Sequence, residues 1–437
     1  MGNRYPVQKA CRGEIIQMAA QNIERKYGTG GNVSRRELLK ESIALAVLYS
    51  VLRPVYGSAI GGQNRRLFAY VGTYGPSVDD GGGNGKGIYL FEMNPATGEL
   101  SLIKLAAAAR NASWLSLDPS GRYLYAANEV ADVGGGTGSV SAFAVNQVNG
   151  NLQLLNVVSS EGAAPVQLSV DAYGKYVFVA NYAGGSIAVL PILTTGALGP
   201  ATYVHQDTNS VGPKIPSSAP PGSFAFSGHD NPHAHMIDAD PGNRFVLQTD
   251  LGQDRIYISS FDRVAGKLSP LPDSPFVSLP PGDGPRHFAF HRNGRWMYSL
   301  QEEASTLVFF HFDPATGSLR PQQTISTLPP GFKGTSFTSE ILLSPDGRFL
   351  YAANRLHDTI AIFSLNHEGR LDYVGETSTL GDYPRHIQLD PGGAFLYACN
   401  QRSDNIASFR VDQKTGLLMF TGRYTSIGSP ACIVFLS

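Results

Sequence analysis

Five ionisable residues occupy matching places in a sequence that repeats itself. His235, Arg286, Glu302, Arg355 and Arg385 come from consecutive copies of the repeat, each at one of two fixed offsets from its turn. Histidine and glutamate can take up or release a proton, and arginine binds carboxylate or phosphate oxygens with its planar donors. Since independent surface residues need not fall at equivalent offsets, the set is a candidate catalytic site.

The repeat combines a turn motif with an aromatic-rich run. Six copies read roughly apolar-x-apolar-Asp/Ser-Pro-x-Gly-Arg, and the run that follows ends in Asn or a similar residue. The copies begin 46 to 69 residues apart, a period typical of β-propeller blades. The turn motifs lie at residues 117–122, 170–175, 239–244, 290–295, 343–348 and 389–394.

The two ends of the repeating region complete the number of blades. Residues 430–436 resemble an innermost strand with nothing after it, whereas residues 67–73, 87–93 and 100–105 resemble three outer strands with nothing before them. Together they form one composite blade. The sequence therefore predicts an all-β, seven-bladed propeller of four-stranded antiparallel blades, closed by pairing of the C-terminal strand with N-terminal strands.

Hairpin register predicts where the ionisable residues meet. Residues six before and ten after the turn proline are equidistant from the turn, so we expect them to be cross-strand neighbours. Arg286 should then face Glu302, and Arg385 should face Gln401. Because the innermost strands of all blades converge on the axis, these positions should form a ring at one mouth of the channel. Glu129 and Tyr182 belong to the same ring.

Composition excludes several classes of function. A formal net charge of -1, a pI near 6.8 and the lack of a basic stripe argue against a nucleic-acid partner. No carboxylate cluster is dense enough to require a hard cation, so we predict neither a metal nor a cofactor. The three cysteines, Cys11, Cys399 and Cys432, do not form a disulfide framework.

The first 60 residues are predicted to be a leader outside the fold, which we place at residues 66–437. Ser34-Arg-Arg-Glu-Leu-Leu-Lys40 resembles a twin-arginine export motif, and an apolar stretch over residues 43–52 follows it. That stretch is too short for a stable membrane span. We expect an exported monomer; the alternative is a cytoplasmic enzyme with a peripheral N-terminal helix.

Several short motifs resemble those of a known family, the seven-bladed propeller lactonases. This family includes the propeller-type 6-phosphogluconolactonases and the 3-carboxy-cis,cis-muconate lactonizing enzymes. The resemblance covers residues 66 to 437. Its motifs are Tyr70-Val-Gly-Thr-Tyr74, Val179-Ala-Asn-Tyr182, Pro232-His-Ala-His235, Gly284-Pro-Arg-His287, Asn354-Arg355 and Pro384-Arg-His386.

The resemblance implies roles for individual residues. It assigns catalysis to His235, Glu302, Arg286 and Arg355. Because lactone hydrolysis needs an activated water and a counter-charge for the oxyanion, we expect His235 or Glu302 to be the base towards water and the arginines to bind the anion. The expected substrate is a small anionic lactone or carboxylate, held in addition by Arg385, His233, Tyr182, Gln167 and Glu129. Many relatives carry histidine where this chain has Gln167, and His205, His229 or His233 are possible substitutes.

Three functions remain open at this point. The first is a metal-free hydrolase that opens 6-phosphogluconolactone or a related aldonolactone. The second is a cycloisomerase that closes a carboxymuconate to its lactone, and the third is a non-catalytic propeller that binds a ligand or protein. An insertion over residues 198–231, rich in Pro, Gly and Ser, is expected to be either a loop that covers the channel mouth or a disordered loop.

Overall fold

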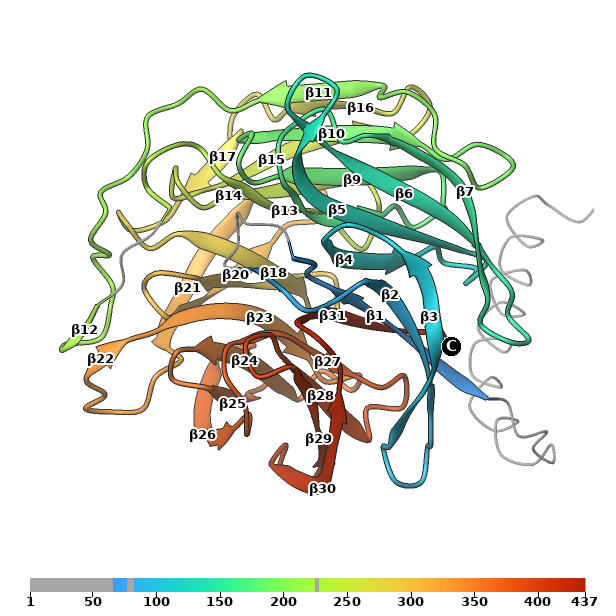
Figure 1. Ribbon diagram of the computed structural model, residues 1–437. Helices are drawn as coiled ribbons and strands as arrows, with labels where there is room; N and C mark the ends of the chain where they lie inside the picture. The colour runs from blue at the N-terminus through green and yellow to red at the C-terminus, as the bar shows by residue number, and fades with distance from the viewer. Residues whose placement is uncertain (1–65, 77–81, 225–227, 437) are drawn as a thin grey trace, which may run out of the picture. The chain divides into compact units, whose positions relative to one another are not determined.

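Each repeat forms an antiparallel hairpin, and each hairpin is the inner half of a four-stranded blade in the computed structural model (Figure 1). The structure describes residues 66–76, 82–224 and 228–436. The predicted leader lies outside these residues. Within them, every regular element is a strand, and none forms a helix with the length and apolar content that a membrane crossing requires.

Blades 1 to 4 follow one another along the chain, each with its innermost strand first. Blade 1 contains β4 (Ala112–Leu117), β5 (Tyr123–Val133), β6 (Thr137–Val145) and β7 (Leu152–Ser159). Blade 2 contains β8 (Pro165–Val170), β9 (Tyr176–Asn181), β10 (Ser186–Pro191) and β11 (Tyr203–Gln206). Blade 3 contains β13 (Ala234–Ala239), β14 (Phe245–Asp250), β15 (Arg255–Asp262), β16 (Lys267–Pro270) and a short extra strand, β17 (Phe276–Ser278), paired with β15. Blade 4 contains β18 (Pro285–Phe290), β19 (Trp296–Gln301), β20 (Thr306–Phe312) and β21 (Leu319–Ser326).

Blades 5 to 7 complete the ring. Blade 5 contains β23 (Phe337–Leu343), β24 (Phe349–Arg355), β25 (Thr359–Leu365) and β26 (Leu371–Ser378), and blade 6 contains β27 (Pro384–Leu389), β28 (Phe395–Asn400), β29 (Asn405–Val411) and β30 (Leu418–Ser426). Blade 7 is the composite one, with β31 (Pro430–Leu436), β1 (Leu67–Thr73), β2 (Gly87–Met93) and β3 (Leu100–Ala108) in that order. The predicted fold class and its closure are therefore confirmed: Ala69 pairs with Phe435 and Val71 with Ile433 across the join.

The aspartate of the repeat holds the hairpin turn together. In blade 3, the Asp240 carboxylate accepts hydrogen bonds from the amides of Gly242, Arg244 and Phe245 at 2.7 to 2.8 Å. The turn also needs one residue with positive φ, which is glycine in the other copies and Asn243, with φ 53°, in this one. The motif Asp-Pro-x-Gly-Arg therefore encodes the turn rather than a reactive group.

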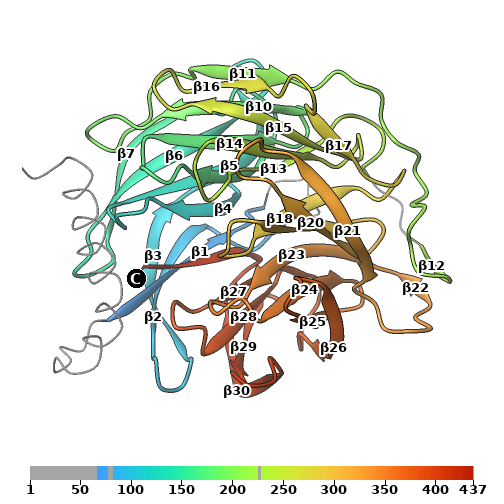
Figure 2. The same cartoon turned by 180° about the vertical axis from the view of Figure 1, so that it is seen from behind.

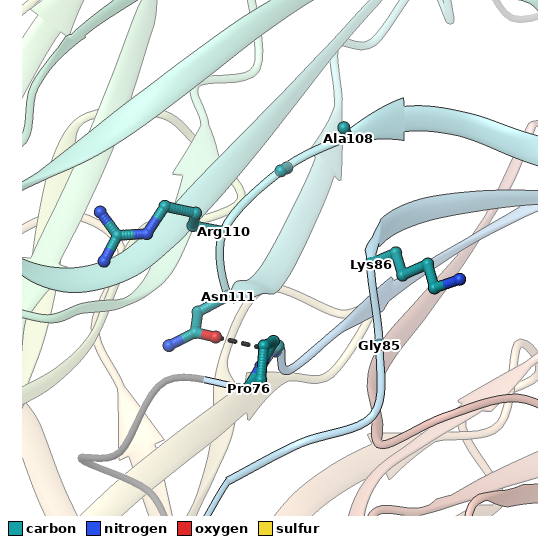
Figure 3. Close-up of a pocket in the computed structure, with 8 residues that line it drawn as sticks. Pro76, Gly85, Lys86, Ala108, Arg110 and Asn111 are labelled. Carbon is teal, nitrogen blue, oxygen red and sulfur yellow. Dashed lines mark hydrogen bonds between the residues drawn. The ribbon is translucent and has the colours of Figure 1, made fainter.

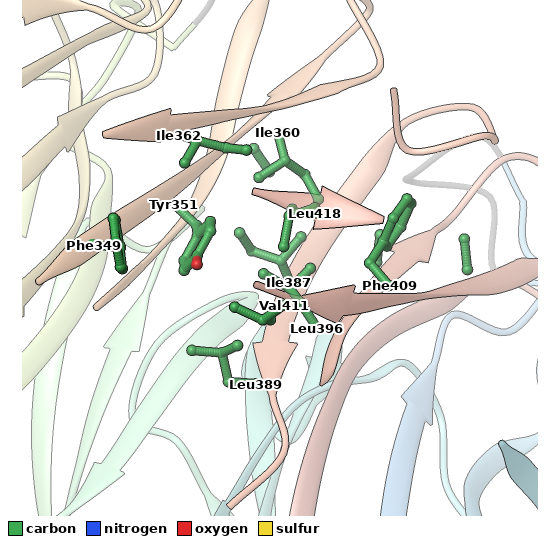
Figure 4. Close-up of a cluster of buried hydrophobic side chains, with 13 residues drawn as sticks. Phe349, Tyr351, Ile360, Ile362, Ile387, Leu389, Leu396, Phe409, Val411 and Leu418 are labelled. Carbon is green, nitrogen blue, oxygen red and sulfur yellow. The ribbon is translucent and has the colours of Figure 1, made fainter. Parts of the chain in front are cut away.

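Aromatic residues of the repeat join neighbouring blades. The hydroxyl of Tyr351 in blade 5 donates a hydrogen bond to the carbonyl of Gly416 in blade 6 at 3.0 Å, and Tyr70, Tyr125, Tyr298 and Tyr397 make the same bond from their blades. Below the hydroxyl, apolar side chains from both sheets interdigitate. Figure 4 shows this layer between blades 5 and 6, where Phe349, Tyr351 and Ile360 pack against residues such as Ile387 and Phe409. Burial between sheets is thus repeated at each blade interface.

A β-bulge interrupts each innermost strand at its mouth end, where the strand begins. In blade 4, Pro285 pairs with Gln301 and His287 with Leu300, so Arg286 has no partner in the ladder. The residues omitted from pairing in the other blades are Ser113, Val166, His235, Ser339 with Glu340, Arg385 and Ala431. The predicted cross-strand pairing of Arg286 with Glu302 and of Arg385 with Gln401 is therefore wrong, because the bulge shifts the register.

The insertion between blades 2 and 3 makes specific contacts at the mouth side. We call residues 207–224 the strap. Its backbone amides at Gly212 and Ser217 donate hydrogen bonds to the carbonyls of Gly252 and Pro281 at 2.8 and 2.9 Å. At its far end, β12 (Ser223–Phe224) pairs in parallel with β22 (Gly334–Thr335), close to blade 5 (Figures 1 and 2). The strap thus runs past the turn between β14 and β15 of blade 3 and past the connection that enters blade 4.

Candidate active site

Glu302 is the centre of a buried charge cluster at the mouth. Its Oε2 lies 2.9 Å from Nε of Arg286, and its Oε1 lies 2.7 Å from Nη2 of Arg355. Both arginine side chains are 3% exposed, so the pairing takes place away from bulk water. The predicted contact between Arg286 and Glu302 is present although the register that predicted it is wrong, because the bulge turns Arg286 out of the ladder and towards the channel.

The two arginines keep Glu302 ionised. Burial disfavours the carboxylate, but the charges of Arg355 and Arg286 outweigh it and hold the pKa of Glu302 below its usual value. Each arginine is held in turn by backbone carbonyls, Arg286 by that of Ser339 and Arg355 by that of Thr338. The guanidinium groups therefore have fixed positions before any ligand arrives.

A third arginine extends the cluster towards blades 7 and 1. Arg385 donates a hydrogen bond to the Tyr74 hydroxyl at 2.8 Å, and that hydroxyl donates to Glu129 at 2.7 Å. The Glu129 carboxylate itself lies 4.0 Å from Arg385. Arg355 also reaches this side, because its Nη1 donates to the Tyr383 hydroxyl at 3.1 Å. Three arginines and two glutamates, Glu129 and Glu302, thus line one side of the mouth.

His235 lies beside the arginines and is held in its neutral form. Burial lowers the pKa of His235 well below its usual value, and the charges of Arg286, His287, Arg385 and Arg355 lower it further. Its ring packs edge to face against Tyr182 and His287, with centroids 5.5 and 5.0 Å apart. Its buried Nδ1 has no hydrogen-bond partner among the described residues. A neutral imidazole is a proton acceptor near neutral pH.

His233 and Tyr182 form the wall next to His235. Their rings stack at 4.1 Å, and the His233 ring lies 2.9 Å from both the Tyr182 carbonyl and the Asp230 carboxylate. Gln167 is close by on β8, but its Oε1 accepts the amide of Ile237 on the neighbouring blade at 3.0 Å. His229 is held by Asp254 at 3.0 Å and His205 lies 3.4 Å from Asp207, so neither contacts the cluster through these pairs.

Behind the cluster lies a layer that the sequence analysis did not assign to the site. Nδ1 of His287 is 3.1 Å from Oε1 of Glu340, and Nε2 of His386 is 3.7 Å from Oε2 of the same carboxylate. Trp114 packs edge to face on both histidines with centroids 5.2 Å apart. Arg286 connects the layers, because its Nη1 lies 3.3 Å from His287 Nε2. The signal was available in part, since His287 and His386 each follow a bulged arginine.

A separate cavity adjoins the Arg385 side of the mouth. It measures about 580 Å³ and is lined by residues 75–76, 85–86 and 108–111. Figure 3 shows that Lys86 and Arg110 point away from each other, so they do not converge on one anion. Asn111 connects the cavity to the cluster by donating a hydrogen bond to the Glu129 carbonyl and accepting one from the Gly75 amide.

The grouping of potential metal-donor side chains bears on whether the site could bind a metal ion. Within residues 66–76, 82–224 and 228–436, no group of three or more His, Cys, Asp or Glu side chains could hold an ion. The carboxylate at the centre of the cluster is instead paired with two guanidinium groups. The arrangement can bind an anion, stabilise a developing negative charge and accept a proton.

Comparison with known proteins identifies the family. The family model described as "Lactonase, 7-bladed beta-propeller" matches residues 68–435. The chain belongs to this lactonase family. It is 32% identical over 372 residues to the 6-phosphogluconolactonase of Bacillus subtilis, covering 85% of this chain and 99% of that one.

Solved structures of relatives agree with the family assignment. A putative 6-phosphogluconolactonase from Bacteroides fragilis superposes with a TM-score of 0.76 at 31% identity, covering 87% of this chain and 100% of that one. The periplasmic gluconolactonase of Pseudomonas aeruginosa gives a TM-score of 0.74 at 29% identity, with 85% and 99% covered. The predicted family and the predicted class of enzyme, a lactonase and hence a carboxylic ester hydrolase, are confirmed. These names do not favour the cycloisomerase or the non-catalytic alternative.

Proposed function

We propose that this lactonase-family chain hydrolyses an aldonolactone, 6-phosphogluconolactone or an unphosphorylated relative, at the cluster around Glu302. The observation that carries the proposal is the pairing of one ionised glutamate with two fixed arginines beside a neutral, buried histidine. Lactone opening needs a base towards water, a counter-charge for the oxyanion and an anchor for polar substrate groups. The mouth draws these groups from several blades, among them His235 from blade 3, Arg286 from blade 4 and Arg355 from blade 5.

The assignment of roles follows from the charges. His235 takes a proton from the attacking water, because it is neutral and has an unshared imidazole lone pair. Glu302 is instead already paired with two arginines, which stabilise its ionised form and reduce its basicity. Arg286 and Arg355 stabilise the tetrahedral oxyanion that forms when water adds to the carbonyl carbon. Arg385, His233, Tyr182, Gln167 and Glu129 are proposed to contact the rest of the substrate.

A substrate panel tests this proposal. Purified protein is assayed against 6-phosphogluconolactone, gluconolactone and 3-carboxymuconate, with and without a chelator. We expect turnover of at least one of the two sugar lactones and no effect of the chelator. Turnover of the muconate alone would contradict the hydrolase proposal, and loss of activity with the chelator would contradict the metal-free mechanism.

We further propose that residues 1–60 are a twin-arginine leader and that the mature chain is an exported monomer. The motif Ser34-Arg-Arg-Glu-Leu-Leu-Lys40 supports export, and so does the similarity to a relative described as periplasmic. Export would favour an unphosphorylated lactone, because phosphorylated sugar intermediates are cytoplasmic. Mass analysis of the N-terminus from separated cell fractions tests the leader, and light scattering tests the oligomeric state. An intact N-terminus in the cytoplasmic fraction would contradict export.

A further inference from the structure

Glu303 directly follows Glu302 in sequence but has the opposite surroundings. Glu303 is 1% exposed, and neither of its carboxyl oxygens has a hydrogen-bond partner among the described residues. The burial is similar to that of His235 and Arg286, each 3% exposed, so all three are enclosed to a comparable degree. A buried carboxylate without donors is costly, whereas a protonated carboxylic acid is far less so.

Packing places Glu303 in the wall that carries Tyr182 and Leu251. Its Oε2 lies so close to Gly284 that a Cβ on this glycine would be 1.8 Å away, and Leu251 lies against the same point. Leu251 also borders the Tyr182 hydroxyl, since a Cβ on Gly228 would lie 2.6 Å from that hydroxyl and 2.9 Å from Leu251. The ring of Tyr182 also contacts His235. Glu303 thus follows the arginine-paired glutamate in sequence and lies in the same wall as Tyr182, the residue that contacts the base.

The charges around Glu303 favour its neutral form. Burial raises the pKa of Glu303 well above its usual value, and the negative charges of Glu302 and Asp254 act in the same direction. The backbone amide of Glu303 and the charge of Arg355 act in the other direction, but the amide does not reach hydrogen-bonding geometry with either carboxyl oxygen and Nη2 of Arg355 is paired with Glu302. Tyr182 remains a neutral phenol near neutral pH, so it adds no charge beside Glu303. Two adjacent glutamates therefore differ in ionisation because their surroundings differ.

We propose that Glu303 is a protonated carboxylic acid that donates its proton to the ring oxygen of the lactone as the ring opens. The proposal rests on the lactone hydrolysis proposed above. Water adds to the carbonyl carbon and loses a proton to His235. The tetrahedral intermediate then expels the ring oxygen, which takes the Glu303 proton and becomes a hydroxyl group. At the end of the reaction His235 is protonated and Glu303 is ionised. Transfer of a proton from His235 to Glu303 through solvent returns both residues to their starting forms.

Alcohol and phenol leaving groups distinguish this role from a structural one. A sugar lactone expels an alkoxide, which is a poor leaving group unless it is protonated, whereas a lactone of a phenol expels a much more stable anion. General acid catalysis typically contributes roughly 10²–10⁴-fold to a rate. Glu303→Gln keeps the size and neutrality of the side chain but has no acidic proton. Its defect should therefore depend on the leaving group.

The experiment compares wild type and Glu303→Gln on gluconolactone and on dihydrocoumarin, a phenolic lactone, across a range of pH. We expect kcat on gluconolactone to fall by roughly 10²-fold or more, and kcat on dihydrocoumarin to change far less. Wild type should lose activity on gluconolactone as pH rises through the pKa of Glu303, and the variant should not show this alkaline limb. Asp238→Asn is the matched control, because Asp238 lies on β13 and burial raises its pKa to about 6. The Asp238→Asn variant should change kcat on gluconolactone and on dihydrocoumarin by the same factor.

One further measurement and the pattern of the kinetic results distinguish failure of this inference from failure of the proposed function. The infrared difference spectrum of wild type minus Glu303→Gln at neutral pH should contain the carbonyl band of a protonated carboxylic acid, and its absence would overturn the inference without any assay. Equal defects on both lactones, or full activity of the variant on gluconolactone, would overturn it while leaving the hydrolase proposal standing. A wild-type protein that opens no lactone would overturn both.

Discussion

The turn end and the mouth end of each innermost hairpin differ in whether their residues recur from blade to blade. At the turn end, the same aspartate and positive-φ residue recur, and their contacts recur with them: Asp171, Asp240 and Asp390 each accept the amide of the residue five positions later. At the mouth end, a bulge recurs but the residue in it does not, since this position holds Ser113, Val166, His235, Arg286 and Arg385 in different blades.

This difference separates the residues that build the fold from those that can do chemistry. A turn residue that accepts backbone amides cannot change without leaving those amides unpaired. A bulge residue makes no ladder bond, so its side chain can change without altering strand pairing. The fold thus provides seven equivalent positions at the mouth, and this chain places histidine or arginine in three of them: His235 in blade 3, Arg286 in blade 4 and Arg385 in blade 6.

The largest expected effect comes from removing a mouth arginine. Arg286→Ala should lower kcat/KM on the best lactone substrate by roughly 10³-fold, because an anion-stabilising group is lost. Glu302 keeps Arg355 at 2.7 Å, so we expect the fold to persist, which thermal unfolding checks. Arg348→Ala is the matched control at the turn end, where the arginine is exposed and pairs with Asp346. Similar losses in both variants would remove the distinction between the two ends.

A smaller effect concerns stability in acid. Burial lowers the pKa of His386 from 6.5 to about 4, so the unfolded chain binds a proton at pH values where the folded chain does not. Folding stability attributable to His386 is therefore complete above pH 6.5 and is lost as pH falls towards 4, by roughly 3 kcal/mol. Denaturant unfolding of wild type and His386→Gln at several pH values measures this difference.

The control for this measurement is His367→Gln, because the His367 side chain is 88% exposed and lies outside the channel. Its unfolding free energy should follow that of wild type at every pH. If His386→Gln also followed wild type between pH 6.5 and 4, the histidine layer behind the cluster would not be held neutral.

The smallest expected effect is at the turn end. Asp240→Ala removes the acceptor of three backbone amides and should lower the free energy of unfolding by roughly 1–3 kcal/mol. We expect kcat to stay within a few-fold of wild type, because Asp240 is at the opposite end of β13 from His235. Chemical denaturation and a lactone assay on the same preparation measure both quantities. A large loss of kcat with normal stability would show that the turn end also determines the chemistry.

The repeat made the fold predictable, because turn and strand signals recur often enough to define blades and to locate the composite one. It also predicted that Arg286 and Glu302 meet. The register was wrong, since nothing in a single hairpin sequence distinguishes a bulged residue from a paired one. Glu340 was missed for the same reason: it lies in the wider irregularity between Thr338 and Ile341, where side-chain alternation gives no guide to direction.

Two other residues near the site could not be recognised from their residue type. Trp114 has the aromatic character of a core residue, and only its contacts with His287 and His386 connect it to the channel. Glu303 was indistinguishable from its neighbour, because ionisation depends on burial and on charges contributed by other blades. Such long-range properties cannot be obtained from local pattern.

The pairing of β31 with β1 also has a kinetic consequence. The innermost strand of blade 7 is β31, residues 430–436, whereas its partner β1 begins at residue 67. During synthesis, β1 must therefore wait with an unpaired edge until residues 430–436 have left the ribosome. Closure of the ring is then a step of high contact order, and a chain without β31 would expose that edge permanently.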